Sequence, residues 1–174
     1  MTKILLAATT LFFNQVVFSQ KVDNAKIVEI RKTVQKINNG TGYLIKKLES
    51  DEFLEEGTDN GAELNGYFKD GKLVKIKEWI GLSSCFNTTE YYLQDGKLIF
   101  SYTKGSQSPY NDSTQTFDYD KLSMTMEYRF YFDKDKLIKS VLQGSSRCSG
   151  EPNNAMAKTV LQECERYKKL LIKK

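Results

Sequence analysis

The stretch YFKDGKLV at residues 67–74 decides the fold, because it recurs as YLQDGKLI at 92–99 and as YFDKDKLI at 131–138. In each copy, two runs of alternating apolar residues flank a two-residue turn, which is the pattern of an antiparallel β-hairpin. Asp-Gly at the first two turns favours a type I′ turn, in which both residues have positive φ. The third copy has Lys134-Asp135 at this place. Because neither residue is glycine, we expect the third turn to be the loosest.

The turn positions predict which side chains share a face of the sheet, because side chains alternate along a strand. We expect Leu93 opposite Leu98, and Tyr91 opposite Phe100. The core face then carries Phe68, Leu73, Leu93, Leu98, Phe132 and Leu137, with Met124, Met126, Tyr128 and Phe130 along the third hairpin. The opposite face, here called the tyrosine face, carries the tyrosine that begins each copy, together with a nearby arginine: Tyr67, Tyr92, Tyr131 and Arg129.

The tyrosine face holds more aromatic side chains than a purely solvated face needs. Tyrosine offers a large contact area with a polar tip and is enriched in contact surfaces. We therefore interpret Tyr67, Tyr92, Tyr131 and Arg129 as a candidate binding surface; the alternative is that a helix or a neighbouring subunit covers this face. A second candidate is the segment 104–113 around Pro109, which has the composition of a long loop, either functional or mobile.

Helices are predicted on both sides of the repeat region. Upstream, one apolar stripe recurs at spacings of three and four residues: Ile27, Ile30, Val34 and Ile37. Asp23 or Asn24 can cap the start of this helix, and Asn38-Asn39-Gly40 suits its end. Downstream, Pro152 suits a first helical turn, and a second stripe follows it: Ala157, Val160, Cys164, Tyr167 and Leu171.

The order of these elements predicts an α+β fold. We expect an antiparallel meander of about six strands, from three hairpins, with an N-terminal and a C-terminal helix packed on its apolar face. The segment 43–48 is ambiguous, and a short strand is favoured there. The acidic run 49–59 fits a solvated loop or a frayed helix turn better than a calcium site, because it lacks the alternating pattern of a calcium loop.

The first nineteen residues have the pattern of a secretory signal peptide. Lys3 precedes a ten-residue apolar stretch, Ile4 to Phe13, which is too short to span a bilayer. Val17 and Ser19 occupy the −3 and −1 positions of a cleavage site before Gln20. We therefore expect residues 1–19 to be removed and residues 20–174 to form one domain. The product is then secreted, periplasmic or extracellular, with no transmembrane segment.

Three cysteines follow the signal, and secretion favours a disulfide among them. Cys85 follows the first hairpin and Cys148 follows the third, so both lie at the end of the sheet away from the Asp-Gly turns. Cys164 lies twelve residues beyond Pro152, which is about 18 Å along a helix. Bonded cysteines have Cα atoms within about 7 Å of each other. We therefore predict a Cys85–Cys148 disulfide and a free Cys164 within the apolar helix stripe.

The composition excludes several classes of chemistry. The chain has no histidine, which removes imidazole bases, Ser-His-Asp and Cys-His triads, and histidine metal sites. We expect no catalytic residue, no metal and no cofactor. The carboxylate pairs Asp118/Asp120 and Asp133/Asp135 are better explained as surface residues. With 26 basic and 22 acidic residues, the charge is too balanced to predict a nucleic-acid partner.

The chain resembles uncharacterised secreted bacterial proteins in three features. These are the signal ending at Ser19, the helix around residues 27–32, and the Tyr-Φ-x-x-x-Lys-Leu hairpins that begin at Tyr67, Tyr92 and Tyr131. The resemblance implies an architecture but no activity, cofactor or catalytic residue. The likeness to MORN-type repeats is distant, because their Gly-x-Trp core is missing and the offsets here, 25 and 39 residues, are irregular.

These observations predict a non-catalytic secreted binding or inhibitor-like module. It would contact an unknown protein, glycan or small ligand through the tyrosine face or the loop near Pro109. Two alternatives stay open: a carboxylate-based enzyme, and a structural envelope component that assembles through sheet edges.

Overall fold

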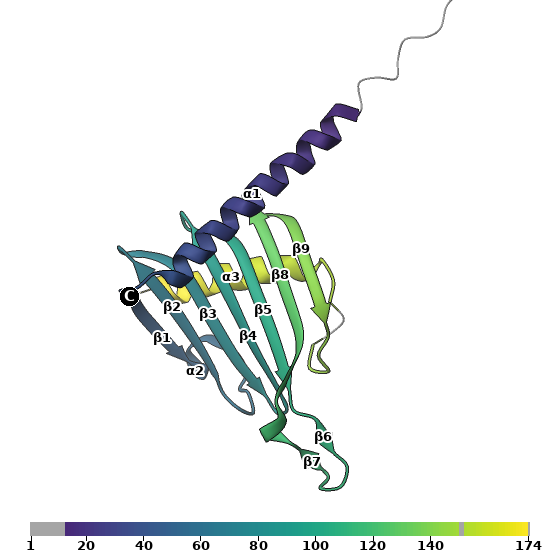
Figure 1. The fold of residues 1–174 in the computed structure, drawn as a ribbon. Helices are drawn as coiled ribbons and strands as arrows, with labels where there is room; N and C mark the ends of the chain where they lie inside the picture. The colour runs from purple at the N-terminus through teal and green to yellow at the C-terminus, as the bar shows by residue number, and fades with distance from the viewer. Residues whose placement is uncertain (1–12, 150–151, 174) are drawn as a thin grey trace, which may run out of the picture.

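A computed structural model of the protein describes residues 13–149 and 152–173. Its centre is a seven-stranded antiparallel sheet in the order β1-β2-β3-β4-β5-β8-β9, which lies between helices α1 and α3 (Figure 1). The fold is therefore α+β, as predicted, with one strand more than three hairpins supply. The elements are α1 Phe13–Asn39, β1 Leu44–Glu49, α2 Ser50–Phe53, β2 Ala62–Lys69, β3 Lys72–Leu82, β4 Cys85–Gln94, β5 Lys97–Gln107, β6 Tyr110–Asn111, β7 Thr116–Phe117, the 3-10 turn η1 Tyr119–Lys121, β8 Ser123–Asp133, β9 Lys136–Gly144 and α3 Met156–Ile172.

The three predicted hairpins are β2–β3, β4–β5 and β8–β9. Both residues of each turn have positive φ: Asp70 and Gly71, Asp95 and Gly96, Lys134 and Asp135. Because antiparallel strands alternate in direction, the three turns lie together at one end of the sheet, here called the tip end. The β1–β2, β3–β4 and β5–β8 connections lie at the opposite, base end (Figure 1).

A β-bulge in each hairpin changes the predicted register beyond the turn. Leu93 pairs with Leu98 as expected, but Tyr92 and not Tyr91 pairs with Phe100. The expected pairing of Tyr91 with Phe100 is therefore wrong, because the β5 strand has one extra residue next to the turn. The bulge places both Ile99 and Phe100 on the tyrosine face, where they join one buried cluster.

The two long helices cover opposite faces of the sheet, so the expectation that both pack on one apolar face is wrong. α3 lies on the core face, where its stripe meets Phe68, Leu73, Leu93, Leu98, Phe132 and Leu137 as predicted. α1 lies on the tyrosine face, where Ile27 and Ile30 are buried against Tyr92, Ile99, Phe100 and Tyr131. The physical reason is that both faces carry aromatic and aliphatic side chains, and each needs a cover.

The helix ends agree with the sequence in part. α1 ends at Asn39, as expected, but it does not begin at Asp23 or Asn24, since residues 13–22 contain no proline or glycine to stop it. Most of the predicted signal, residues 1–12, lies outside the described residues. Pro152 precedes α3 and is not in its first turn. None of the described helices is long and apolar enough to cross a membrane.

Candidate binding surface

A short arm projects from the base end of the sheet, between β5 and β8 (Figure 1). The sequence predicts a loop at 104–113, but β5 continues to Gln107, and the chain then forms the β6–β7 hairpin and η1. We call residues 108–122 the arm. Its hairpin closes with Tyr110 opposite Phe117 and with Gln115 at positive φ, 51°.

Aromatic side chains run along the arm in contact with one another. The ring centroids of Tyr110 and Phe117 are 5.4 Å apart, and those of Phe117 and Tyr119 are 6.4 Å apart, both edge to face. The guanidinium of Arg147 lies over the Phe117 ring, 4.8 Å from its centroid. Edge-to-face pairs and cation–π contacts each stabilise such a cluster by roughly 0.5–1.5 kcal/mol. The rings therefore hold one another in place although they lie near solvent.

The arm and the start of β8 carry half of the large hydrophobic side chains that are exposed in the described chain. Tyr110, Tyr119 and Leu122 are exposed by 50%, 54% and 50%, and Met124 by 60%. The expected burial of Met124 on the core face is therefore wrong, because a bulge at Gly105/Ser106 separates it from the regular part of the ladder. Single exposed hydrophobes are ordinary, whereas several together mark a contact site. We call Tyr110, Phe117, Tyr119, Leu122 and Met124 the arm patch.

The predicted disulfide is present and anchors the root of the arm. Cys85 at the start of β4 is bonded to Cys148, with Cα atoms 6.3 Å apart, and Cys164 is free and buried. Arg147, next to Cys148, donates a hydrogen bond from its guanidinium to the Ser108 carbonyl. The Ser108 amide in turn donates to the Ser84 carbonyl at 2.9 Å, next to Cys85. Both chain segments that carry the disulfide are therefore tied to the first residue of the arm.

The predicted tyrosine surface is largely covered. Tyr67, Tyr92 and Tyr131 do lie on the face opposite the leucines, which confirms the register argument. Tyr92 and Tyr131 are only 1% and 3% exposed, because α1 lies over them. The Tyr92 hydroxyl donates to Asn38 of α1, at 2.9 Å. In this fold these two tyrosines belong to the interface between sheet and helix, and Tyr67 is half-buried at its margin.

Beyond α1, the tyrosine face remains open toward the base end (Figure 1). Arg129 lies there, paired with Glu127 at 3.0 Å and positioned over the Tyr102 ring at 5.0 Å. Three strands away, on β3, Trp79 stacks on Phe86 of the neighbouring β4, with ring centroids 6.3 Å apart. Sequence reasoning missed Trp79. This residue lies two positions after Lys77 along β3, so both side chains are on the same face as the tyrosines. These side chains are half-buried and pack against one another, so they present less free apolar surface than the arm patch.

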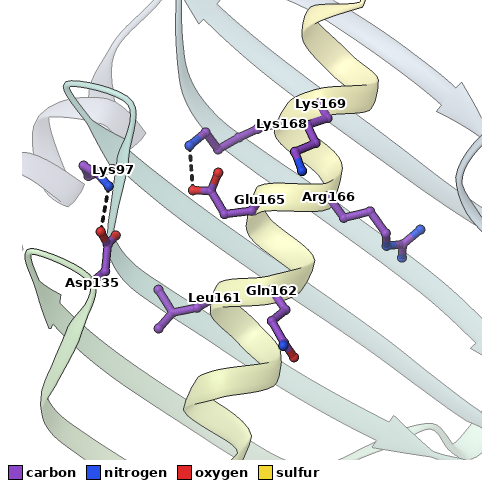
Figure 2. Close-up of a pocket in the computed structure, with 8 residues that line it drawn as sticks. All are labelled: Lys97, Asp135, Leu161, Gln162, Glu165, Arg166, Lys168 and Lys169. Carbon is purple, nitrogen blue, oxygen red and sulfur yellow. Dashed lines mark hydrogen bonds and ion pairs between the residues drawn. The ribbon is translucent and has the colours of Figure 1, made fainter.

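Two hollows border α3 and the tip end. One, of about 580 Å³, runs along α3, and ion pairs of Lys97 with Asp135 at 2.6 Å and of Lys168 with Glu165 at 2.7 Å lie beside it (Figure 2). The second is a groove of about 1020 Å³ between the ends of both helices and the first two hairpin turns. The first hollow is lined by two carboxylates, Asp135 and Glu165, and each of them is held in an ion pair with a lysine.

The carboxylates that could support acid–base chemistry are engaged elsewhere. Asp118 makes an ion pair with Lys121 at 2.8 Å, and this neighbour lowers the pKa of the Asp118 carboxyl. Asp135 is paired with Lys97. The buried Glu78 lies beneath α3 and accepts hydrogen bonds from the hydroxyls of Tyr167 and Tyr91, and it lines neither hollow. Each of these carboxylates is therefore held by a neighbouring cation or hydroxyl.

Within residues 13–149 and 152–173, no group of acidic or cysteine side chains is arranged to hold a metal ion. No family model, curated protein or solved structure matches the chain. Among the described residues, the arm and the start of β8 carry four of the eight exposed large hydrophobic side chains.

Proposed function

We propose that this protein is a non-catalytic protein-binding module and that the arm patch is its contact surface. The observation that carries the proposal is the exposure of Tyr110, Tyr119 and Leu122 on a projecting arm with a disulfide at its root, and of Met124 at the start of β8 directly after it. Tyrosine, phenylalanine, methionine and arginine are the residue types enriched at the centres of protein interfaces. All four types are present in the arm patch and in Arg147 above it.

The shape and charge of the arm favour a protein over other ligands. Small-molecule sites are concave, whereas the arm projects from the body of the fold (Figure 1). A polyanion such as nucleic acid needs a basic surface, but the arm carries Asp112, Asp118 and Asp120 against the single cation Lys121. A partner with an apolar cleft fits both properties.

The anchoring of the arm supports an inhibitor-like mode of binding. A loop that is held in one conformation before binding loses less entropy when it is bound, and this preorganisation raises affinity. Here the backbone amide of Asp118 donates to the carbonyl of Pro109 at 2.9 Å, which closes the arm on itself. Arg147 and the disulfide fix its root. The disulfide also supports action in an oxidising compartment outside the cytoplasm.

Affinity capture with matched variants tests this function. Immobilised protein is incubated with the extracytoplasmic fraction of the producing cells, and retained proteins are quantified by mass spectrometry. We expect Tyr119→Ser/Leu122→Ser to lose a partner that the wild type retains, by about tenfold or more, since two such hot-spot side chains exceed 1.4 kcal/mol. The control Val28→Ser/Ile45→Ser, which removes side chains that are 50% and 54% exposed and lie outside the arm, retains the partner. Equal retention by both variants, or no partner for the wild type, contradicts the proposal.

A further inference from the structure

Lysines gather at the tip end of the sheet, opposite the arm. They come from the three hairpin turns, from the last turn of α1, from β1 and from the last turns of α3. At this end of the sheet, the lysines outnumber the carboxylates. The lysines are Lys36, Lys46, Lys69, Lys72, Lys97, Lys134, Lys136, Lys168, Lys169 and Lys173. The carboxylates at this end include Asp70, Asp95, Asp133, Asp135 and Glu165, and Glu29 of α1 pairs with Lys26 beside Asp133.

The base end has the opposite charge. Residues 49–59, at the end of β1 and in its connection to β2, carry no basic residue and six acidic ones: Glu49, Asp51, Glu52, Glu55, Glu56 and Asp59. Antiparallel strands place this connection at the end of the sheet away from the three hairpin turns (Figure 1). The molecule is therefore electrically polarised along its strands, although its 26 basic and 22 acidic residues nearly balance. Such a charge distribution orients a protein at a charged surface.

Several of the tip-end lysines are free to meet an external anion. Lys97 and Lys168 are held in ion pairs with Asp135 and Glu165 (Figure 2). Lys36, Lys72 and Lys169 are exposed and make no ion pair with any described residue. Lys36 and Lys72 line the groove of about 1020 Å³ from opposite sides, α1 and the first hairpin turn. Lys169 lines the neighbouring hollow along α3.

Apolar side chains accompany these cations. The groove between the ends of α1 and α3 is lined by Ile37, Tyr43, Val74 and Ile172 among others. Ile172, in the last turn of α3, is 59% exposed, and Leu44, next to Tyr43, is 73% exposed. A cationic rim around exposed aliphatic side chains matches an interface that is anionic at its surface and apolar below it.

We propose that the tip end docks on an anionic lipid bilayer, with the free lysines at the phosphate layer and with Ile172 and Leu44 entering its edge. In this orientation the acidic base end points away from the anionic membrane surface. The arm then projects into the aqueous phase, where a partner protein can reach it (Figure 1). This peripheral attachment needs no membrane-spanning helix.

Vesicle sedimentation of the oxidised protein tests this docking. One set of vesicles contains phosphatidylglycerol and phosphatidylcholine in equal parts, and the other contains phosphatidylcholine alone. We expect binding to the anionic vesicles only, and we expect it to weaken as salt rises, because screening shortens the range of the charges. Lys72→Glu/Lys169→Glu should lower the partition coefficient at least about 25-fold, at about fivefold for each lysine near an anionic surface.

Matched variants separate docking from general charge. Lys104→Glu/Lys158→Glu makes the same change in net charge at two exposed lysines that line neither hollow, and we expect less than about a fivefold loss. Ile172→Ser should weaken binding several-fold, whereas Leu122→Ser in the arm should leave it unchanged. Equal binding to both kinds of vesicle, or equal losses in the two lysine pairs, overturns the proposal. Circular dichroism of each variant checks that it is folded.

Discussion

The guanidinium of Arg147 lies 4.8 Å from the centre of the Phe117 ring, so the residue next to Cys148 contacts the aromatic cluster of the arm. The disulfide fixes Cys148 against Cys85 at the start of β4. Through Arg147, the disulfide therefore links β4 of the sheet to the arm patch. This relationship makes the disulfide a determinant of arm geometry as well as of stability.

The pairing of the cysteines has a direct chemical readout. Burial raises the pKa of the Cys164 thiol to about 12, so this thiol is un-ionised and shielded in the folded protein. We expect no alkylation of the native oxidised protein and a single alkylated residue, Cys164, after denaturation without reductant. Peptide mapping that finds Cys148 joined to Cys164, or three free thiols in protein from an oxidising compartment, contradicts the pairing.

Removing the disulfide should lower stability substantially. Cys85 and Cys148 are 63 residues apart, and closing a loop of that length contributes about 4 kcal/mol by chain entropy. We expect Cys85→Ala/Cys148→Ala to lower the free energy of unfolding by about that amount, measured by urea denaturation. Cys164→Ala, which leaves the cross-link intact, serves as the control for loss of a buried sulfur. If the double variant were as stable as this control, the disulfide would not stabilise the fold, which would contradict its role as the anchor of the arm.

The hairpin turns give a test of backbone conformation without steric interference. Gly71 and Gly96 have φ of +74° and +75°, and a Cβ atom added at either would meet nothing within 4 Å. Any cost of Gly96→Val therefore arises from positive φ, and we expect about 1–2 kcal/mol by thermal or urea denaturation. Gly57→Val is the matched control, because its site is equally open but its φ is not in the positive region. Equal stability of the two variants would show that the turn is not type I′.

The cover that α1 provides over the tyrosine face can be measured through Tyr131. Its ring contacts Phe100 at 4.8 Å between centroids, and Arg31 of α1 donates to its hydroxyl at 3.4 Å. We expect Tyr131→Ser to lower the free energy of unfolding by about 2 kcal/mol or more. Tyr110→Ser, at a half-exposed ring of the arm, loses only its edge-to-face contact with Phe117 and should lower it by about 1 kcal/mol. A Tyr131 variant as stable as the Tyr110 variant would mean that α1 does not cover this face in solution.

Glu78 should make stability depend on pH in the sense opposite to a carboxylate whose pKa is lowered by a cation in the folded state. Burial under α3 raises the pKa of its carboxyl above the ordinary value of 4.5, and the Tyr167 and Tyr91 hydroxyls offset only part of this effect. The folded state then binds the proton more tightly than the unfolded state, so the contribution of Glu78 is fully present below the unfolded-state pKa. It is lost as pH rises through the folded-state pKa.

Urea denaturation between about pH 4 and pH 8 measures this contribution by comparison with Glu78→Gln. The stability of the wild type relative to this variant should fall as pH rises, because glutamine does not titrate. Glu56→Gln, at an exposed carboxyl, is the control and should show no such trend. If the difference in free energy of unfolding between wild type and Glu78→Gln stayed constant with pH, the Glu78 carboxyl would be exposed to solvent rather than buried under α3.

The sequence predicts the hairpins well because their signal is local. Asp-Gly specifies the turn, and alternation then assigns Leu93 and Leu98 to one face. The bulge that pairs Tyr92 with Phe100 is not visible in the same pattern, since an extra residue next to the turn leaves the apolar alternation nearly unchanged. The helix stripes likewise show that Ile30 and Tyr167 are buried, but a stripe does not state which face of the sheet it covers.

The arm shows where local sequence signals fail for a candidate site. Segment 104–113 contains glycine, serine and proline and therefore resembles a loop, although its continuation closes a hairpin through Tyr110 and Phe117. Contacts with segments that are distant in the sequence help to order it, namely those of Arg147 with Ser108 and Phe117 and that of the Ser108 amide with Ser84. The sequence predicts a candidate binding loop around Pro109. The exposure of Tyr119 and Leu122 next to it is visible only in the three-dimensional structure.

The central claim is that the arm patch contacts a partner protein, and site-specific photo-crosslinking tests it most directly. A photoreactive phenylalanine analogue replaces Tyr119, and in a second sample it replaces Val28, which is as exposed but lies on α1. After irradiation in the extracytoplasmic fraction of the producing cells, the account predicts a discrete cross-linked protein from position 119 and none from position 28. Cross-linking from position 28 alone, or an equal and diffuse pattern from both positions, would contradict it.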